Sequence, residues 1–440
     1  MTDLTGRSVL VWGFGRHGGG LAAARHCAAH GARVSILEQR PREDFGAAGA
    51  EAAAQGWEWH IGDAGHAAFG RCDLVVASPA IPPRAWPLKH PPRSCPEALF
   101  FAAHQGPRIA VTGTKGKSTT ATIIATLLGW PVGGNSHEPL LDTLARDGVQ
   151  SPLVCELSSF QLWYLAEMRP RFQVAVFTSF ARDHLDWHPD IEHYRAAKLA
   201  VLSWADSCAI APEMEQIALR CAPRLGKIVL VGGEFRALDG SVIARRTDLP
   251  LPGDHNARNA CLAISAALKI GVPAAEIAER LRAVRGLPHR LETVHQAGDW
   301  RYVNDSIATT PESAIAGMNA LTGPLCVILG GSDKGAEFIE LAAAAARRGA
   351  LAVVIGQTAP RISSALSLYG LRPKPAATIE EAVSLARAQL PAGGTILLSP
   401  ACASFDMFRG FEDRGERFTR AARAITDDAG GTPFAGNHPP

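Results

Sequence analysis

The sequence predicts an α/β protein of three successive domains whose sheets are mostly parallel. Short apolar runs rich in valine and isoleucine alternate with helical stretches along most of the chain, and glycine or proline separates them. Alternation of strands with helices favours parallel strands joined by helical crossovers. The 440 residues are more than one hydrophobic core usually holds, so several domains are expected.

The first expected domain covers residues 1–95 and is Rossmann-like. Apolar runs predict strands at residues 9–12, 34–37 and 74–77. The stretch 19–29, which follows a glycine-rich turn, is expected to form a helix.

The second expected domain covers residues 96–286 and resembles a P-loop ATPase in its order of elements. A β-branched run at 109–112 precedes a glycine-rich loop, and residues 119–128 carry no glycine or proline and suit a buried helix. Further strands are expected at 153–156, 174–177 and 209–210.

The third expected domain covers residues 287–440 and is again Rossmann-like. Its predicted strands are 301–303, 326–329, 352–355 and 395–398, separated by alanine-rich helical stretches such as 341–348. Residues 426–440 are rich in proline and glycine and lack apolar periodicity, so we expect them to be disordered.

Composition excludes several classes of partner. The 44 basic and 42 acidic residues leave a net charge of +2, which gives no global field for nucleic acid or an anionic membrane. No apolar run is long enough to span a bilayer and the start lacks a signal peptide, so we expect a cytoplasmic protein, acting as a monomer. The nine scattered cysteines form no CxxC pair and indicate neither disulfides nor a zinc site.

The most informative segment is residues 111–120, Val-Thr-Gly-Thr-Lys-Gly-Lys-Ser-Thr-Thr. It is typical of a strand that ends in a phosphate-binding turn and opens a helix, where backbone N–H groups and the helix N-terminus face an anion. Lys117 would neutralise the outer phosphates, and Ser118 or Thr119 would offer a hydroxyl to magnesium. The loop is shorter than GxxxxGK[ST], so it is a contracted variant. It predicts a user of nucleoside triphosphate.

A second glycine-rich turn lies at residues 13–18, Gly-Phe-Gly-Arg-His-Gly, with Glu38 at the end of the next expected strand. This pattern matches a dinucleotide fingerprint and would fit an NAD-dependent dehydrogenase. A dehydrogenase has no use for a triphosphate loop about a hundred residues downstream. An enzyme that holds the diphosphate of a UDP-sugar would use both loops.

Three further segments carry groups suited to chemistry. Glu156 ends a buried strand, where an unpaired charge is costly and a magnesium ion would compensate it; the alternative is a helix cap. The segment 183–188, Asp-His-Leu-Asp-Trp-His, follows another strand and favours a metal or phosphate role over a solvated turn. Lys198, taken alone, suits an exposed helix.

The order of these motifs resembles the Mur ligases of peptidoglycan synthesis, most closely their D-glutamate-adding members. The blocks that carry the resemblance are GTKGKST, ELSSFQ, DHLD, YRAAKL, GDHNARNA, GLPHR, NDSIATT, GGSDKG and SPACASFDMF. They extend over residues 8–420. Several blocks in one order are far more specific than any single motif.

The resemblance implies a role for each matched residue. The UDP-substrate would be bound by Gly15, Arg16, His17, Glu38, Gln39, Arg40, Asn135 and Ser158. ATP would be bound by Gly113, Thr114, Lys115, Gly116, Lys117, Ser118, Thr119, Asn259, Arg290 and Asp305, with His255 and Asn256 matching the same region. Glutamate would be held by Thr309, Lys334, Ser404 and Phe411.

The same resemblance implies Mg²⁺ as a second cofactor. Its ligands would be Ser118, Glu156, His184 and a carbamylated Lys198, and the catalytic set would be Lys117, Glu156, His184 and Lys198. Carbamylation requires the neutral amine, yet at an unperturbed pKa near 10.4 only about one lysine in 2,500 is neutral at pH 7. Lys198 would therefore need a lowered pKa or a metal that traps the product.

The implied reaction has two stages. The terminal carboxylate of the UDP-muramoyl-alanine substrate attacks the γ-phosphate of ATP, and the glutamate amine then displaces phosphate from the acyl phosphate. Positioning and charge stabilisation would supply most of the catalysis. We expect the third domain to close on the second during the reaction.

Other functions stay open at this point. An L-glutamate-adding Mur ligase fits the segments 113–120 and 304–313, whereas Ser399–Ser404 matches the D-glutamate enzymes better. More remote alternatives are a ligase like folylpolyglutamate synthase, a UDP-sugar binder without catalysis, and the NAD-dependent dehydrogenase.

One departure from the family pattern generates a prediction. Ile307 stands where these enzymes usually carry lysine, and Lys115 stands where they usually carry asparagine. Two smaller departures are Thr310 and Ala80. We hypothesise that Lys115 supplies the charge missing at Ile307, so Lys115→Asn should lower turnover in a phosphate-release assay. Unchanged turnover would contradict this compensation.

Overall fold

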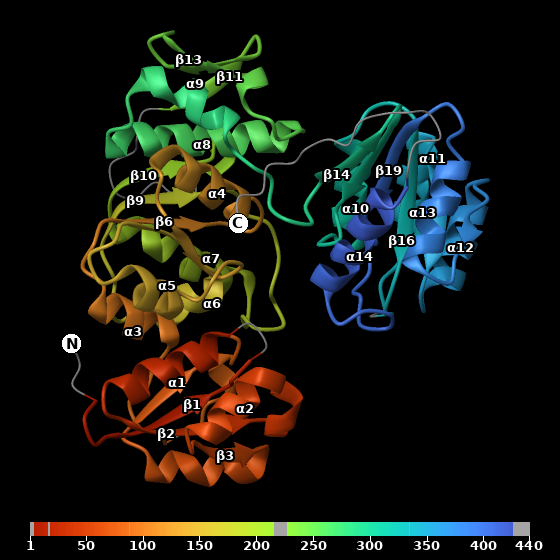
Figure 1. Cartoon of the computed structure of the whole chain (residues 1–440). Coiled ribbons are helices and arrows are strands. Elements are labelled where there is room, and N and C mark those ends of the chain that lie inside the picture. Colours follow the sequence, from red (N-terminus) through yellow and green to blue (C-terminus); the bar gives the residue numbers. More distant parts are fainter. Residues whose placement is uncertain (1–3, 16–17, 88, 215–226, 334, 426–440) are drawn as a thin grey trace. The chain divides into compact units, whose positions relative to one another are not determined.

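The fold is described from a computed structural model, which describes residues 4–15, 18–87, 89–214, 227–333 and 335–425. The chain divides into two compact units, Met1–Arg285 and Gly286–Pro440. The first contains two separate five-stranded sheets and the second contains a six-stranded sheet (Figure 1). The predicted α/β class with mostly parallel sheets is confirmed, while the bounds of the three expected domains stay a prediction.

The first sheet of unit 1 has the strand order β3-β2-β1-β4-β5, and all of its pairs are parallel. Its strands are β1 (Ser8–Trp12), β2 (Arg33–Glu38), β3 (Glu58–Ile61), β4 (Leu74–Ala77) and β5 (Arg93–Ser94). The helices of this segment are α1 (Gly19–Ala29), α2 (Gly46–Ala54) and α3 (Pro96–Ala103). The strands at β1, β2 and β4 were predicted. β3 and β5 were missed, because neither contains a buried residue and β5 has only two residues.

The residues of β1 alternate between the two faces of this sheet. Val9 and Val11 belong to the core that includes buried residues of α1, whereas Leu10 and Trp12 pack with Phe69 on the other face. This alternation follows from the two-residue period of a strand. Both faces of the sheet are therefore buried, as a parallel sheet requires.

The central sheet of unit 1 has the order β10-β9-β6-β8-β7 and is also fully parallel. Its strands are β6 (Arg108–Thr112), β7 (Val132–Gly134), β8 (Leu153–Glu156), β9 (Phe172–Phe177) and β10 (Ala205–Ile210). Its helices are α4 (Lys117–Leu128), α5 (Leu140–Asp147), α6 (Ser159–Tyr164), α7 (Ile191–Leu199), α8 (Asp254–Ile270) and α9 (Ala274–Arg282). The expected helix after the glycine-rich loop is α4, and it packs against α8 and α9.

A small antiparallel sheet lies beside α8 and α9 (Figure 1). It consists of β11 (Ile228–Val231), β12 (Glu234–Ala237) and β13 (Val242–Arg245). None of these three strands was predicted from the sequence. Its four-residue strands alternate apolar and polar residues weakly, and several of its apolar side chains are exposed.

Unit 2 has the strand order β14-β15-β19-β16-β17-β18, in which only the β14–β15 pair is antiparallel. Its strands are β14 (Glu292–Ala297), β15 (Trp300–Asn304), β16 (Leu325–Gly330), β17 (Leu351–Ile355), β18 (Lys374–Pro375) and β19 (Gly394–Leu398). Its helices are α10 (Pro311–Asn319), α11 (Ile339–Arg348), α12 (Ala359–Leu368), α13 (Ile379–Ala388) and α14 (Phe411–Arg423). The four predicted strands are β15, β16, β17 and β19.

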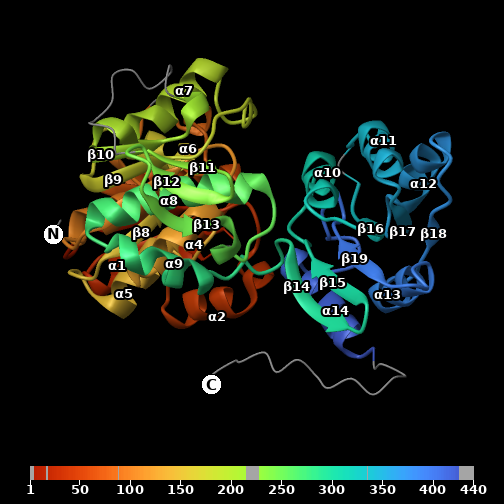
Figure 2. The ribbon, with the colours of Figure 1, turned by 90° about the horizontal axis from the view of Figure 1, so that it is seen from above.

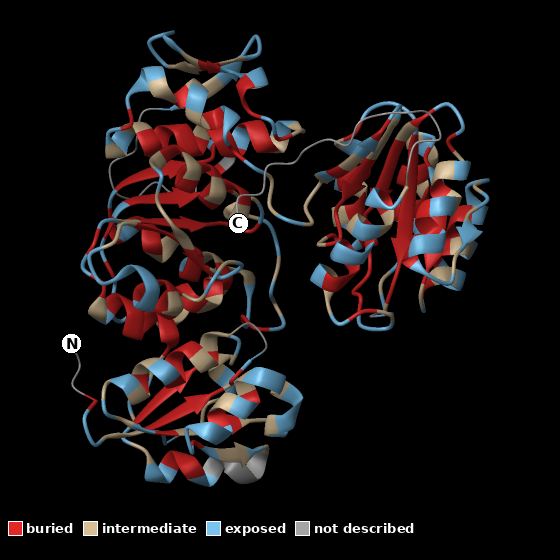
Figure 3. Cartoon of the chain, viewed as in Figure 1, coloured by how far each residue is buried: buried red, intermediate tan, exposed pale blue. Residues whose placement is uncertain are grey.

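Helices cover both faces of the sheet in unit 2. Figure 2 shows α10, α11 and α12 on one side of the strands and α13 and α14 on the other. Val327 and Leu329 pack under the first group, and Cys326 and Ile328 pack under the second. The strands therefore form the buried middle layer, which Figure 3 shows in red.

Two further expectations concern cysteines and membranes. Eight cysteines are described, and no disulfide joins any two of them. No helix within the described ranges has the length and apolar content needed to cross a bilayer. The expected disorder at residues 426–440 concerns residues outside the described part of the chain.

Gly20 packs so closely against the backbone that adding a methyl group at this position should lower the stability of the protein. A Cβ atom at Gly20 would lie 2.4 Å from the carbonyl oxygen of Phe14, whereas a Cβ at Gly19 would meet nothing within 4 Å. We expect Gly20→Ala to lower the free energy of unfolding by about 1–3 kcal/mol because it overpacks a backbone contact. The matched control Gly19→Ala should be neutral or stabilising by up to about 1 kcal/mol, since alanine favours the helix. Urea unfolding measures both, and equal effects of the two variants would contradict this account.

Candidate active site at the carboxyl end of the central sheet

The glycine-rich loop between β6 and α4 depends on two glycines. Gly113 has φ 148° and a Cβ there would lie 2.1 Å from the Thr178 hydroxyl oxygen. Gly116 has φ 84° and a Cβ there would lie 2.6 Å from Oδ1 of Asn259 on α8. Both backbone angles lie in the region that favours glycine, so both glycines are required by geometry and by space. Asn259, expected to bind ATP, lies directly against this loop.

Side chains from the segment after β9 fix the course of this loop. The Lys115 carbonyl oxygen accepts hydrogen bonds from the hydroxyls of Thr178 (2.5 Å) and Ser179 (2.9 Å). The hydroxyl of Thr114 lies 2.8 Å from that of Tyr194 on α7, and the Thr114 amide donates to the Ser179 carbonyl. The loop is thus held in one conformation. The first amides of α4, including those of Ser118 and Thr119, lack an intrahelical acceptor and suit an anion.

Two lysine ammonium groups share one carbonyl oxygen of this loop. Lys117 Nζ donates to the Gly113 carbonyl at 3.0 Å and to the Thr114 carbonyl at 3.0 Å, and Lys198 Nζ donates to the same Gly113 carbonyl at 2.7 Å. Lys198 is only 1% exposed, so the expectation of an exposed helix is wrong for this side chain. Burial lowers the pKa of Lys198 well below its usual value, and the charge of Lys117 lowers it further.

Glu156, at the end of β8, is fully buried beside the loop after β7. Its Oε1 accepts hydrogen bonds from Asn135 Nδ2 (2.9 Å) and from the Ser136 hydroxyl (3.3 Å), and its Oε2 lies 3.2 Å from His137 Nε2. Burial opposes ionisation, but His137, Asn135 and the charge of Lys117 outweigh it and lower the pKa of Glu156. The carboxylate is therefore ionised at neutral pH.

His184 has an unusual backbone and a neutral imidazole. Its φ of 54° is uncommon outside glycine, and its amide donates to Oδ1 of Asp183. Burial lowers the pKa of His184; Asp183 opposes this, and the charges of Lys198 and Lys117 add to it. The neutral ring is the form that binds metals. Lys117 and Lys198 thus lie within electrostatic reach of each other and of both Glu156 and His184.

The side chains around Glu156 and His184 fit a magnesium ion whose remaining ligands come from other molecules. Among the described residues no three or more His, Cys, Asp or Glu side chains gather into a metal cluster. No donor in the described chain makes an aligned hydrogen bond to Oε2 of Glu156, although this atom is buried. Such an oxygen suits a hard cation, and Mg²⁺ typically takes one or two carboxylates together with phosphate oxygens. The residues present therefore fit the ion.

The glycine-rich turn of the first sheet is organised by Glu38. Its Oε2 accepts the amides of Phe14 (2.9 Å) and Gly15 (3.2 Å), and its Oε1 accepts the amide of Gln39 (2.8 Å). Gly15 has φ 67°, and the guanidinium of Arg40 lies 4.4 Å from the ring centre of Phe45. Two other expected residues of this site, Arg16 and His17, lie outside the described residues.

Aromatic side chains that the sequence analysis did not single out connect this turn to the central sheet. The Trp187 indole N–H donates to the carbonyls of Pro79 and Ala80, and the Tyr164 hydroxyl donates to that of Ile81. A Cβ at Gly13 would lie 3.2 Å from Ile81, so the same loop lies against the turn. Within unit 1, the expected UDP and metal residues are joined by hydrogen-bonded contacts. Trp187 lies within the segment 183–188, but the sequence gives no signal for the contacts of Trp187 and Tyr164, because these join loops about a hundred positions apart.

Ser158 contributes to structure as an N-cap. Its hydroxyl accepts from the Gln161 amide, and the Gln161 side chain accepts from the Ser158 amide, which forms a capping box. Gln161 also donates to the buried Glu97 (2.7 Å). A role of Ser158 in binding the UDP-substrate stays a prediction.

The expected nucleotide residue Asp305 lies at the end of β15 in unit 2. Its Oδ1 accepts the Leu291 amide (3.2 Å) and its Oδ2 accepts the Ser399 hydroxyl (2.7 Å). Burial raises the pKa of Asp305 to about 6, against opposing effects of these bonds and of Arg290. Leu291 has φ 45°, so the backbone next to Arg290 is strained.

Three of the four expected glutamate residues lie at the same edge of this sheet. Thr309 follows β15, Ser404 follows β19 and Phe411 begins α14. Ser404 is only 2% exposed and its carbonyl accepts the Phe408 amide. The fourth, Lys334, lies outside the described residues.

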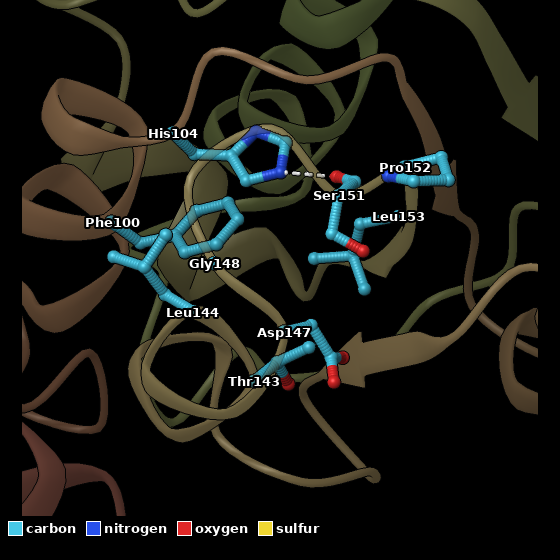
Figure 4. A pocket seen from close by; sticks show the side chains of 9 residues that line it. All are labelled: Phe100, His104, Thr143, Leu144, Asp147, Gly148, Ser151, Pro152 and Leu153. Atoms are coloured by element: carbon cyan, nitrogen blue, oxygen red, sulfur yellow. Dashed lines mark hydrogen bonds between the residues drawn. The ribbon is translucent and has the colours of Figure 1, made fainter.

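A small hollow elsewhere in unit 1 does not belong to these sites. Figure 4 shows His104 bonded to the Ser151 carbonyl at 2.8 Å, with Phe100, Leu144 and Leu153 around it. Its residues adjoin the amino ends of β6 and β8. Ligands of parallel sheets bind at the opposite, carboxyl ends. We therefore regard this hollow as a packing feature.

Comparisons with known proteins agree with this geometry. Residues 111–229 match the Mur ligase middle domain, and residues 289–402 match the Mur ligase glutamate ligase domain. A UDP-N-acetylmuramoylalanine--D-glutamate ligase of Pelotomaculum thermopropionicum is 35% identical over 95% of this chain and 98% of its own. One of Geotalea uraniireducens is 33% identical over 97% and 100%.

Solved structures show the same fold. A UDP-N-acetylmuramate-alanine ligase of Thermotoga maritima matches with a TM-score of 0.59 and 18% identity, over 95% of this chain and 99% of that one. A MurF ligase of the same organism, in complex with ADP, matches with a TM-score of 0.55 and 16% identity, over 96% and 99%.

The raised pKa of Asp305 predicts a pH-dependent stability. Because the pKa of the folded state, about 6, exceeds the ordinary value of 3.8, the contribution of this carboxyl is fully present at low pH and is lost as the pH rises through 6. Asp305→Asn removes this pH-dependent loss of stability, because asparagine does not ionise. Between about pH 5 and pH 7.5 the variant should gain about 1 kcal/mol in unfolding free energy relative to wild type, one pKa unit being about 1.4 kcal/mol.

Urea unfolding of the full chain at the two pH values tests this. The exposed Asp239, which lies in unit 1, provides the matched control Asp239→Asn. A difference between Asp305→Asn and wild type that does not change with pH would contradict the proposed burial of a titrating carboxyl.

Proposed function

The chain belongs to the Mur ligase family, and we propose that it joins D-glutamate to UDP-N-acetylmuramoyl-L-alanine with ATP as the energy source. The observation that carries the proposal is the full-length likeness to curated D-glutamate ligases, combined with the two lysines that converge on Gly113. The product is a peptidoglycan precursor. Every substrate is then a small molecule, and we propose a cytoplasmic, monomeric enzyme.

The phosphate loop and its supports suit the triphosphate. Lys117 lies at the first position of α4, where its ammonium can leave the loop carbonyls and neutralise the outer phosphates. The residues that we propose for ATP are Gly113, Thr114, Lys115, Gly116, Lys117, Ser118, Thr119, Asn259, Arg290 and Asp305. Amides of the first turn and one lysine are the groups that hold phosphate in such loops.

Magnesium would be held by Ser118, Glu156, His184 and, once carbamylated, Lys198. When bound, the ion would neutralise charge that develops on the phosphate oxygens. The lowered pKa of Lys198 supports carbamylation, because carbon dioxide reacts with the neutral amine and a buried, charge-repelled lysine loses its proton more readily. Oε2 of Glu156, which lies 3.2 Å from His137 Nε2 but accepts no aligned hydrogen bond from the described residues, supports its role as a ligand.

The turn between β1 and α1 would hold the UDP part of the substrate. We propose for it Gly15, Arg16, His17, Glu38, Gln39, Arg40, Asn135 and Ser158. The left-handed glycines and the helix that follows suit a diphosphate. The amides bound to Glu38 keep the turn in shape, which assigns this carboxylate a supporting role.

The incoming glutamate would bind in unit 2 through Thr309, Lys334, Ser404 and Phe411. Hydroxyls and an ammonium suit its two carboxylates. In the proposed sequence the muramoyl-alanine carboxylate attacks the γ-phosphate and ADP leaves; the glutamate amine then attacks the acyl phosphate and inorganic phosphate leaves. Lys117 would stabilise the charge of the first step.

A product assay tests the proposal. UDP-N-acetylmuramoyl-L-alanine and ATP are offered with D-glutamate or L-glutamate, and the amide product is detected by mass spectrometry. We expect product and phosphate with D-glutamate. Product with L-glutamate but not with D-glutamate would favour the L-glutamate-adding type of Mur ligase. Phosphate release that requires neither the UDP-substrate nor glutamate would contradict a ligase.

Lys117→Met should lower kcat by at least about a hundredfold, the usual effect of losing a group that stabilises transition-state charge. Lys269→Met, on an exposed position of α8, is the matched control and should leave turnover unchanged. Full turnover by Lys117→Met would contradict the assigned role.

A further inference from the structure

Arg414 is the largest side chain among the fully buried residues described. It lies in the first turn of α14 and is 0% exposed. Its Nε donates to the Ser306 hydroxyl (2.9 Å) and its Nη2 to the Ser306 carbonyl (2.8 Å). Its Nη1 donates to the carbonyls of Cys402 (3.0 Å) and Ala403 (3.3 Å). Every acceptor is therefore neutral.

No carboxylate within the described residues forms an ion pair with this guanidinium. The neighbouring arginines behave differently, since Arg409 and Arg417 approach Asp413, and Arg420 approaches Glu416. Burial lowers the pKa of Arg414 to about 10, against opposing effects of Cys402 and of the Asp406 carboxylate, and this still leaves the guanidinium charged at neutral pH. A buried charge that no carboxylate contacts directly is unfavourable, so its retention requires an explanation.

The guanidinium lies beneath the loops that carry the proposed glutamate residues. Ser306 lies between Asp305 and Thr309 in the loop after β15, and its hydroxyl donates to the Phe411 carbonyl (2.7 Å). Cys402 and Ala403 precede Ser404 in the loop after β19. A Cβ at Gly331, after β16, would lie 3.2 Å from Nη1 of Arg414. One side chain thus contacts three loops and the start of one helix.

One of these loops needs such a support. Ala401 has φ 62°, in the left-handed region that favours glycine, and its amide donates to the Ala308 carbonyl (2.9 Å). Residues held in this region persist only where their surroundings determine them strongly. Arg414 binds the next two carbonyls and so holds Ser404 at a fixed position.

We propose that Arg414 is a positioning residue of the amino-acid site, and that its charge, which no described carboxylate pairs with directly, makes this site selective for an amino acid with an acidic side chain. The inference rests on the proposed function. The guanidinium touches protein groups only and acts through the loops that it fixes. Its field is poorly screened beneath them, and it favours a second carboxylate over a neutral amide.

The test compares glutamate with glutamine as acceptors in the full-length enzyme. Arg414→Gln keeps hydrogen-bonding groups and removes the charge, and Arg414→Lys keeps the charge and removes the planar fork. Arg417→Gln and Arg417→Lys are matched controls on the exposed side of the same helix. Near-ultraviolet circular dichroism verifies the fold of each variant.

We expect Arg414→Gln to lower the ratio of kcat/KM for glutamate over glutamine by about tenfold. This is less than the usual loss when one partner of a direct, buried charge pair is removed, because Arg414 does not touch the ligand. Arg414→Lys should keep that ratio and raise the KM for glutamate by about fivefold, while the KM for ATP stays within about twofold. The Arg417 controls should match wild type.

A purely structural role would lower turnover with both acceptors equally, and an unchanged ratio in folded Arg414→Gln overturns the selectivity. If that variant does not fold, Arg414→Lys decides, because an unchanged KM for glutamate overturns the positioning role. If the wild-type enzyme does not ligate glutamate, the proposed function is overturned. If the wild-type enzyme ligates glutamate and the Arg414 variants have wild-type kinetics, this inference alone is overturned.

Discussion

The arrangement of the active site depends on one backbone atom, the carbonyl oxygen of Gly113. Two ammonium groups, those of Lys117 and Lys198, converge on it from α4 and α7. Burial lowers the pKa of Lys198, the more buried of the two, and the nearby charge of Lys117 lowers it further. The conformation of Gly113 is itself fixed by Thr178, against which no side chain could fit. The turn proposed to bind the nucleotide therefore lies beside a lysine with a lowered pKa, as the proposed carbamylation requires.

The parallel sheets explain why this convergence is possible. β6, β8 and β9 run in one direction, so the loop before α4, Glu156 and the segment that leads to His184 all emerge at one edge. Each contributes a group of different charge from a separate part of the sequence. The first sheet is joined to this edge through the carbonyls of residues 79–81, which Trp187 and Tyr164 bind. Unit 1 therefore holds its expected substrate and metal residues on one connected support.

The sequence predicted the structure best where the residues have a strong preference for one backbone conformation. The strands with buried apolar runs, the helix after Gly18 and the loop at residues 113–116 follow from local patterns, because glycine and β-branched residues have strong conformational preferences. β3, β7 and the β11–β13 sheet were not predicted, since their stability comes from neighbours rather than from their own residues. The burial of Lys198 was also missed. Its helix, with Glu192 and Arg195, has the composition of an exposed one, and only the packing against Tyr194 and Gly113 encloses the amine.

The partners of the buried charged residues in unit 2 also depend on tertiary packing. Asp305 and Ser306 are adjacent at the end of β15, yet they face different partners: Asp305 accepts from Ser399 and Leu291, and Ser306 binds Arg414. The chain leaves β15 after Asn304 and turns at Ser306, so Asp305 and the serine that binds Arg414 have separate partners although they are adjacent in sequence. The hydrogen bonds of each come from neutral groups, while the charges of Arg290 and Asp406 act on Asp305 and Arg414 from further away. Because neither neutralises the other, this edge of the sheet keeps a cation available to an acidic ligand, and a direct Asp305–Arg414 pair would have removed it.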